Sequence, residues 1–233
     1  MTREILPWDS EFFGMKIGRV LHPAAADVLA AAAWARAEGI RCLYALVDAG
    51  GTSARRALED EGFRETDLRL TLDRDAAAAP EPPGHNIRPA RAGDLPALEA
   101  LARISHRNTR FYEDGRFDRA RCDDLYAVWV RKAFDSPDTS VLVPDADGRA
   151  AGYLTLEQGR PEARIGLVAV APDQQGRGLG DALLVEAVRL ARAAGSERIR
   201  VVTQGRNARA VRFYERGGFR ARSREFWYHR WFD

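Results

Sequence analysis

A short glycine-rich segment is the part of the sequence best suited to chemistry. In Gln175-Gly-Arg-Gly-Leu-Gly180, glycine follows at every second position after Gln175, and an apolar helix is expected directly afterwards over Asp181–Ala194. Because glycine carries no side chain, several backbone N–H groups can point into one concavity. These donors and the partial positive charge at a helix start together bind a pyrophosphate. The segment therefore predicts a site for a phosphorylated cofactor.

The residues of this segment exclude two better-known phosphate motifs. A Walker loop needs Gly-Lys followed by Ser or Thr, and the sequence contains no such triplet. The dinucleotide fingerprint G-x-G-x-x-G fails because Asp181 occupies its third glycine position. A tight glycine turn between a strand and a helix is the plain structural alternative.

A second segment with matching chemistry lies downstream. Arg198–Gln204 is short and rich in β-branched residues, as a strand is, and a helix capped by Asn207 and closed at Gly217-Gly218 should follow. Together the two segments resemble the GNAT acetyltransferase superfamily. They match its Q/R-x-x-G-x-G loop and, in the right order, its N-x-x-A-x-x-F/Y-Y-x-x-x-G-F motif. The marked positions of the second motif are Asn207, Ala210, Phe213, Tyr214, Gly218 and Phe219.

The resemblance covers about residues 86–233 and implies an acyl-CoA N-acyltransferase fold, of α/β class with a mixed sheet, that uses acetyl-CoA and no metal. In this family, strand 165–171 splays from strand 198–204, and the pantetheine arm of the cofactor enters the gap. The implied cofactor-binding residues are Leu167, Val168, Val170, Gln175, Gly176, Arg177, Gly178, Leu179, Gly180 and Asn207.

Tyr214 is the expected general acid for the departing thiolate. It lies two helical turns after Asn207, on the same face of the helix. A core tyrosine at helical spacing is the alternative. The general base is harder to identify: Glu157, at the end of strand 150–158, is the expected carboxylate, and His106 and Tyr112 lie in the variable segment that normally covers the acceptor.

Composition narrows the class of protein. The chain has 233 residues, and 45% of them are hydrophobic, which is enough for one large or two small soluble domains. A net charge of +2 gives no reason to expect a nucleic-acid partner. No apolar run is long enough to span a membrane, and the N-terminus lacks a secretory core. The isolated Cys42 and Cys122 form no metal pattern. We therefore expect a cytoplasmic protein.

The chain divides by composition into an N-terminal α/β lobe over 1–75, a proline-rich linker over 76–86 and a catalytic domain over 87–233. The domain should contain a partly helical segment up to Asp135, three neighbouring strands, and a final pair of strands around 219–232. The lobe repeats the order of the second motif: strand 40–47, helix 53–61, Gly62-Phe63 and strand 67–72. It looks like a truncated GNAT half without the glycine loop. An unrelated lobe with this common order is the alternative.

The start, Trp8-Asp-Ser-Glu-Phe-Phe-Gly14, resembles one GNAT branch, the dTDP-fucosamine acetyltransferases. That resemblance implies a nucleotide-linked amino sugar as the acceptor. Arginine and aromatic residues in segment 105–135 suit a nucleotide diphosphate. Phe213 departs from the branch, which has arginine there. Two other acceptors are possible, another small amine or a protein N-terminus. The alternative to an enzyme is an acyl-CoA-binding module that has lost its activity. The sequence also allows a homodimer.

Overall fold

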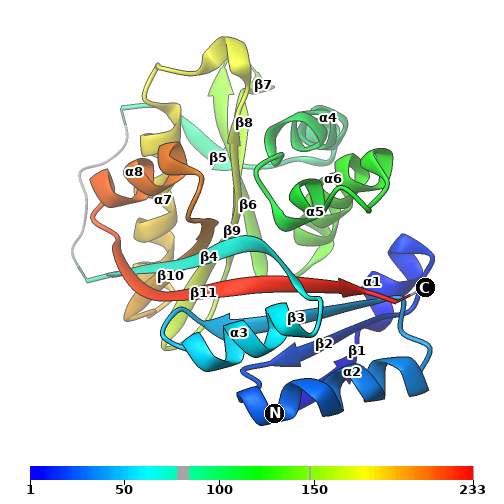
Figure 1. The fold of residues 1–233 in the computed structure, drawn as a ribbon. Coiled ribbons are helices and arrows are strands. Elements are labelled where there is room, and N and C mark those ends of the chain that lie inside the picture. The colour runs from blue at the N-terminus through cyan, green and yellow to red at the C-terminus, as the bar shows by residue number, and fades with distance from the viewer. Residues whose placement is uncertain (78–83, 147, 233) are drawn as a thin grey trace.

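One mixed β-sheet runs through the whole chain in the computed structural model, which describes residues 1–77, 84–146 and 148–232. The strand order is β1-β2-β3-β11-β4-β10-β9-β8-β6-β5, and β7 pairs with β6 beside this path. Figure 1 shows the sheet strongly twisted, with helices on both faces. The predicted α/β class with a mixed sheet is confirmed.

The elements follow the predicted order over residues 40–75 and 87–216. The strands are β1 (Thr2–Ile5), β2 (Ile17–Leu21), β3 (Cys42–Asp48), β4 (Arg64–Asp75), β5 (Ile87–Pro89), β6 (Thr139–Ala146), β7 (Arg149–Ala150), β8 (Gly152–Glu157), β9 (Glu162–Val170), β10 (Arg198–Gln204) and β11 (Arg220–Trp231). The α-helices are α1 (Pro7–Phe13), α2 (Val28–Ala37), α3 (Thr52–Asp60), α4 (Leu95–Ser105), α5 (Arg110–Asp114), α6 (Arg119–Asp135), α7 (Leu179–Ala193) and α8 (Ala208–Arg216). Short 3-10 turns are η1 (Ala25–Asp27), η2 (Ala92–Asp94) and η3 (Pro172–Gln174).

The two halves of the chain exchange strands. β11, the last strand, lies between β3 and β4 of the N-terminal part, and β4 pairs in turn with β10. The unit β3-α3-β4 and the unit β10-α8-β11 therefore each contribute their second strand to the other. The sheet crosses the predicted boundary at residues 76–86 without a break. Residues 78–83 of that predicted linker lie outside the described residues, and the division into domains stays a prediction.

The prediction of two strands around 219–232 is wrong. Residues Arg220–Trp231 form the single strand β11, with two shifts of register against β4. The segment contains no Gly, Pro, Asn or Asp, the residues that the tight turns of hairpins most require. β11 pairs with β3 on one side and with β4 on the other, so neither edge is left for a hairpin partner.

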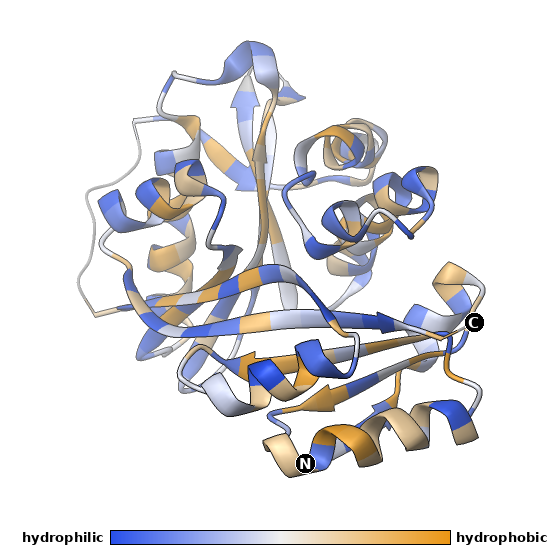
Figure 2. Cartoon of the chain, in the orientation of Figure 1, coloured by the Kyte–Doolittle hydropathy of each residue, from blue (hydrophilic) through white to orange (hydrophobic). Residues whose placement is uncertain are grey.

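Alternation along the strands divides the side chains between two faces. In β8, Leu154 and Leu156 pack against α7 and α8, whereas Tyr153 faces α4 and α6. Figure 2 shows hydrophobic and hydrophilic residues alternating along the strands and helices. Helices α1, α4, α5 and α6 thus cover one face of the sheet, and α2, α3, α7 and α8 cover the other. Within the described ranges, no helix is both long and apolar enough to cross a membrane.

Candidate active site

A wedge opens between β9 and β10. The two strands pair in parallel only from Glu162 with Arg198 to Ile165 with Val201. Beyond that point the register ends, and β9 continues to Val170 while β10 continues to Gln204. The predicted divergence of the two strands is therefore present, with the backbone of each strand bordering the gap.

A β-bulge in β9 causes the divergence. Against β8, the register of β9 shifts so that Leu156 pairs with Ile165 but Leu154 pairs with Val168. The extra residue increases the local bend and twist of the bulged strand. The hydroxyl oxygen of Thr155 accepts a hydrogen bond from the Leu167 N–H at 2.8 Å. A Cβ on Gly166 would lie 2.7 Å from that oxygen, so only glycine fits there.

The backbone of β9 offers donors to the wedge at alternate residues. The N–H groups of Leu167 and Ala171 both donate toward β8, to Thr155 and to the Ala151 carbonyl. By alternation along the strand, the N–H groups of Val168 and Val170 point the opposite way, into the wedge. Of the three predicted backbone contacts, Val168 and Val170 thus face the gap, whereas the Leu167 N–H is already engaged.

The glycine loop has the backbone conformation of an anion cradle. Gly176 and Gly178 have φ values of 79° and 77°, in the left-handed region that favours glycine, and Gly178 caps α7. Gly180 is required for a different reason, the space beside it: a Cβ at this position would lie 3.2 Å from the Phe213 ring. The imidazole of His85, which the sequence did not suggest, approaches to 3.4 Å from a Cβ built on Gly178.

A cavity of about 680 Å³ lies beside the loop and the wedge. The predicted site residues that line it are Val168, Val170, Gln175, Gly176, Gly178, Leu179, Gly180, Asn207 and Tyr214. Leu167, Arg177 and Glu157 are not among its lining residues within the described chain. Arg209, Arg212 and Arg216 line it from α8, at the spacing of one helical face. That spacing is the sequence signal by which the positive wall could have been found.

Gln175 joins the two walls of this cavity. Its side-chain amide donates to the Val170 carbonyl at 3.0 Å, and its oxygen accepts from the Arg209 guanidinium at 2.8 Å. These contacts tie the end of β9 to α8 at the level of the glycine loop. The first residue of the loop motif therefore positions the Arg209 side chain beside the expected pyrophosphate site.

Asn207 and Tyr214 occupy the predicted positions on α8. The Asn207 side-chain oxygen caps the helix by accepting from the Ala210 N–H at 3.1 Å. Tyr214 is buried, packs edge-on against Phe219 and lines the cavity. Burial raises the pKa of its phenol well above the usual value near 10, so the hydroxyl keeps its proton at neutral pH. This state is the one that a proton donor requires.

The structure does not bring Glu157 to the cavity. Its side chain is 57% exposed and lies 3.6 Å from Arg164, its partner in the β8–β9 register. It sits where β9 and β10 are still paired, at the closed end of the wedge. His106 contacts the Tyr153 hydroxyl at 2.7 Å, and burial lowers its pKa to about 4. Tyr112 donates to Asp123. Neither faces the cavity as a free base.

A second, smaller cavity of about 120 Å³ lies under α5 and α6. It is lined by Asp67, Arg69, Thr109, Arg110, Phe111, Tyr126, Trp129, Val202, Thr203, Gln204 and Trp227. The residues Val202–Gln204 belong to the part of β10 that borders the wedge. Asp67 comes from β4, so the N-terminal part of the chain contributes a carboxylate here, at a position that no sequence motif marks.

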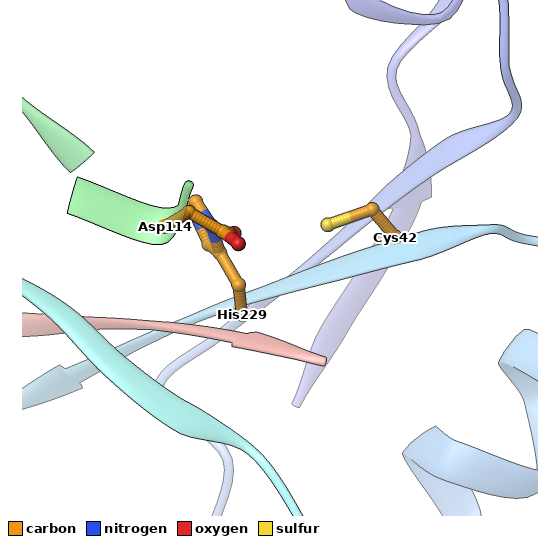
Figure 3. A group of neighbouring side chains, drawn as sticks. All are labelled: Cys42, Asp114 and His229. Atoms are coloured by element: carbon orange, nitrogen blue, oxygen red, sulfur yellow. The ribbon is translucent and has the colours of Figure 1, made fainter. Parts of the chain in front are cut away.

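Cys42, Asp114 and His229 form a buried group next to this cavity (Figure 3), with ligand atoms within 4.8 Å of one another. The Asp114 carboxylate accepts from His229 Nδ1 at 2.5 Å and from the Trp231 indole at 3.0 Å. On the other ring nitrogen of His229 lies the Arg110 guanidinium, at 3.3 Å. The Arg110 guanidinium and the donors on His229 and Trp231 already satisfy the polar atoms of Asp114 and His229. The arrangement therefore suits hydrogen bonds that hold α5 against β11 better than a metal site.

Comparison with known proteins gives a consistent result. The Acetyltransferase (GNAT) family model matches residues 98–219. The dTDP-fucosamine acetyltransferase of Escherichia coli O6:H1 is 31% identical over 248 aligned positions, which cover 97% of each chain. The spore coat polysaccharide biosynthesis protein SpsD of Bacillus subtilis is 29% identical over 64% of this chain but only 52% of its own. A GCN5-related N-acetyltransferase from Sphaerobacter thermophilus has the same fold, with a TM-score of 0.70 at 19% identity over 98% of this chain and 76% of that one.

Proposed function

This chain belongs to the acetyltransferase (GNAT) family, and on that premise we propose that it transfers the acetyl group of acetyl-CoA to the amino group of a nucleotide-linked amino sugar. The observation that carries the proposal is the opening of β9 from β10 beside a cavity lined by the glycine loop and Tyr214. The acceptor class rests on the Escherichia coli relative, whose alignment covers both chains almost completely.

The large cavity has the size and chemistry for the co-substrate. Its volume of about 680 Å³ lies within the ordinary range of ligand pockets. The loop supplies backbone donors for the pyrophosphate, and the guanidinium groups of Arg209, Arg212 and Arg216 supply positive charge for phosphate oxygens. The wedge leaves the N–H groups of Val168 and Val170 available to the pantetheine arm and the thioester.

In the proposed reaction, the neutral amine attacks the thioester carbonyl directly. A backbone N–H from Val168 or Val170 polarises the carbonyl oxygen, on which negative charge develops. One preorganised donor of this kind is worth about 3–4 kcal/mol of barrier. Tyr214, which is protonated at neutral pH and lines the cavity, then gives its phenolic proton to the departing thiolate.

A direct assay tests the proposal. Release of free CoA is measured with dTDP-4-amino-4,6-dideoxy-D-galactose, and in parallel with an amino acid, an aminoglycoside and a peptide with a free N-terminus. We expect the highest kcat/KM with the nucleotide sugar. Preference for another amine would support the proposed acetyl transfer but contradict the proposed acceptor. Binding of acetyl-CoA without turnover of any amine would favour a lapsed acyl-CoA-binding module instead.

A further inference from the structure

Asp67 is an unusual carboxylate in this structure. It lies on β4 and is only 3% exposed, and its Oδ1 atom is buried without a hydrogen-bond partner. A buried polar atom in this state is costly unless a ligand or a reaction uses it. The residue lines the second cavity beside Val202–Gln204, the wedge-facing end of β10. An acidic group is therefore held beside the part of β10 that borders the wedge.

The charged groups around Asp67 compensate its negative charge only in part. The Arg206 Nε atom lies 3.7 Å from Oδ1, but Arg206 is directed toward Glu113, at 2.5 Å, and toward the Thr66 carbonyl, at 2.7 Å. Arg110 on α5 lines the same cavity, yet its guanidinium is stacked on Tyr44 and Trp227. Arg69, two residues along β4, pairs with Glu225 on β11.

These surroundings set the basicity of the group. Burial raises the pKa of Asp67 to about 7, against the lowering effects of Arg206, Arg110 and the Leu68 backbone N–H, and Glu113 raises the pKa further. A general base works best with a pKa near the operating pH. The wall also holds the guanidinium groups of Arg69, paired with Glu225, and of Arg110, stacked on Trp227, together with the rings of Tyr126 and Trp129. The Asp67 carboxylate beside the Tyr126 and Trp129 rings suits an ammonium group and the carbon skeleton next to it.

We propose that Asp67 accepts the proton of the acceptor ammonium group, and that the second cavity is where this amine binds. The inference rests on the proposed function and deepens it. It assigns a catalytic residue to the N-terminal part of the chain, through the strand that the two halves exchange. The cavity of about 120 Å³ holds the amine and the atoms next to it, not the whole acceptor.

The proton balance of the step is complete. The ammonium group gives one proton to the Asp67 carboxylate, and the nitrogen lone pair then forms the C–N bond with the thioester carbon. The C–S bond breaks as the tetrahedral intermediate collapses, and Tyr214 protonates the thiolate. The second proton on nitrogen re-protonates Tyr214, and Asp67 releases its proton to solvent. One amide, one thiol and one proton result from the thioester and the ammonium ion.

The experiment compares Asp67→Asn, Asp67→Glu and the matched control Asp73→Asn. Asp73 is a second buried acid on the same face of β4, but Arg198 holds it at 2.7 Å, away from the cavity. Rates are measured from pH 5.5 to 9 with dTDP-4-amino-4,6-dideoxy-D-galactose and acetyl-CoA. We expect Asp67→Asn to lower kcat at least 100-fold and to remove the rise of activity near pH 7. Asp67→Glu should keep that rise with a smaller loss, and Asp73→Asn should keep both the rise and the rate.

Thermal unfolding gives a second readout that does not depend on turnover. Because the folded-state pKa of Asp67 is raised, ionisation above about pH 7 opposes folding, and this cost is absent below the unfolded-state pKa near 3.8. Asp67→Asn should therefore raise the Tm at pH 8 by about 2 °C or more, with less gain at pH 5.

The outcomes separate the two proposals. Asp67→Asn with the rate and pH profile of the wild type overturns this inference alone. A Tm for Asp67→Asn that is below the wild type at pH 8 and falls further as pH rises also contradicts it. A wild-type protein that acetylates none of the amines overturns the proposed function, and this inference with it.

Discussion

The backbone N–H of Leu167 donates to the hydroxyl oxygen of Thr155 at 2.8 Å, and this contact sits at the point where β9 leaves β10. The hydroxyl satisfies the amide that the bulge removes from the regular ladder. It also explains the glycine at 166, whose missing Cβ leaves room for the oxygen. The wedge thus depends on the Thr155 side chain of β8, which lies on the face of the sheet opposite to α7 and α8.

Replacing Thr155 by valine should weaken the wedge. The Leu167 N–H would lose its partner at a partly buried position, at a cost of about 1 kcal/mol in the free energy of unfolding. We expect the KM for acetyl-CoA to rise about tenfold as β9 shifts. Denaturant unfolding and initial rates measure the two effects. The control is Thr71→Val, since the Thr71 hydroxyl is buried without a hydrogen-bond partner. Equal behaviour of both variants would contradict this role for Thr155.

Removing the phenol of Tyr214 should slow the chemical step. Tyr214→Phe is expected to lower kcat about 100-fold with little change in the KM for acetyl-CoA, because the hydroxyl acts on the leaving thiolate rather than on binding. Stopped-time assays of CoA release measure this. Tyr228→Phe removes another buried phenol, one that contacts Arg55 and Glu59 in the N-terminal part, and should leave kcat unchanged. Unchanged turnover in Tyr214→Phe would refute the proton-donor role.

A methyl group on Gly178 should strain the cradle. Both Gly178→Ala and the control Gly39→Ala place alanine at a positive φ, 77° and 65° respectively, at a cost of about 1 kcal/mol each. Only Gly178 lies in the loop, so only Gly178→Ala should raise the Kd for acetyl-CoA, by about tenfold or more. Calorimetry and thermal unfolding of both variants measure this. A loss of affinity in both would indicate a global effect and not a phosphate site.

Acid should destabilise the fold through His229. Burial lowers its pKa to about 4 in the folded state, so the unfolded chain takes up a proton below about pH 6.5 while the folded chain does not. Stability is therefore full above pH 6.5 and is lost as pH falls toward 4, on the order of 3 kcal/mol for this residue. His229→Gln should reduce that slope, and His106, which has a similar shift, should account for part of the rest. A slope that His229→Gln leaves unchanged would contradict the assignment.

The sequence allowed the cofactor side of the site to be predicted because its signals are local. The glycines at 176 and 178 adopt the positive φ values that the loop requires, and Asn207 caps the helix that carries Tyr214. Each of these depends on neighbouring residues and on the period of one helix. The divergence of β9 from β10 followed from the family resemblance, and Gly166 with Thr155 supplies its physical cause.

The acceptor side could not be predicted in this way because it is built from distant segments. Asp67 belongs to a strand whose alternation of Leu68, Leu70 and Leu72 with polar residues reads as an ordinary half-buried strand. Its position beside the wedge arises only because β4 pairs with β10, more than a hundred residues later in the chain. Glu157 has the residue type of a base, but the register of β8 carries it to the exposed end of the sheet.

Titration calorimetry of the purified protein with acetyl-CoA is the decisive measurement, because the wedge and the glycine loop are assigned to this co-substrate. We expect one binding site per chain, with a Kd between about 1 µM and 1 mM, as is usual for an enzyme substrate. Absence of binding heat at millimolar acetyl-CoA, at two temperatures, would contradict the assignment of the wedge and the glycine loop to this co-substrate.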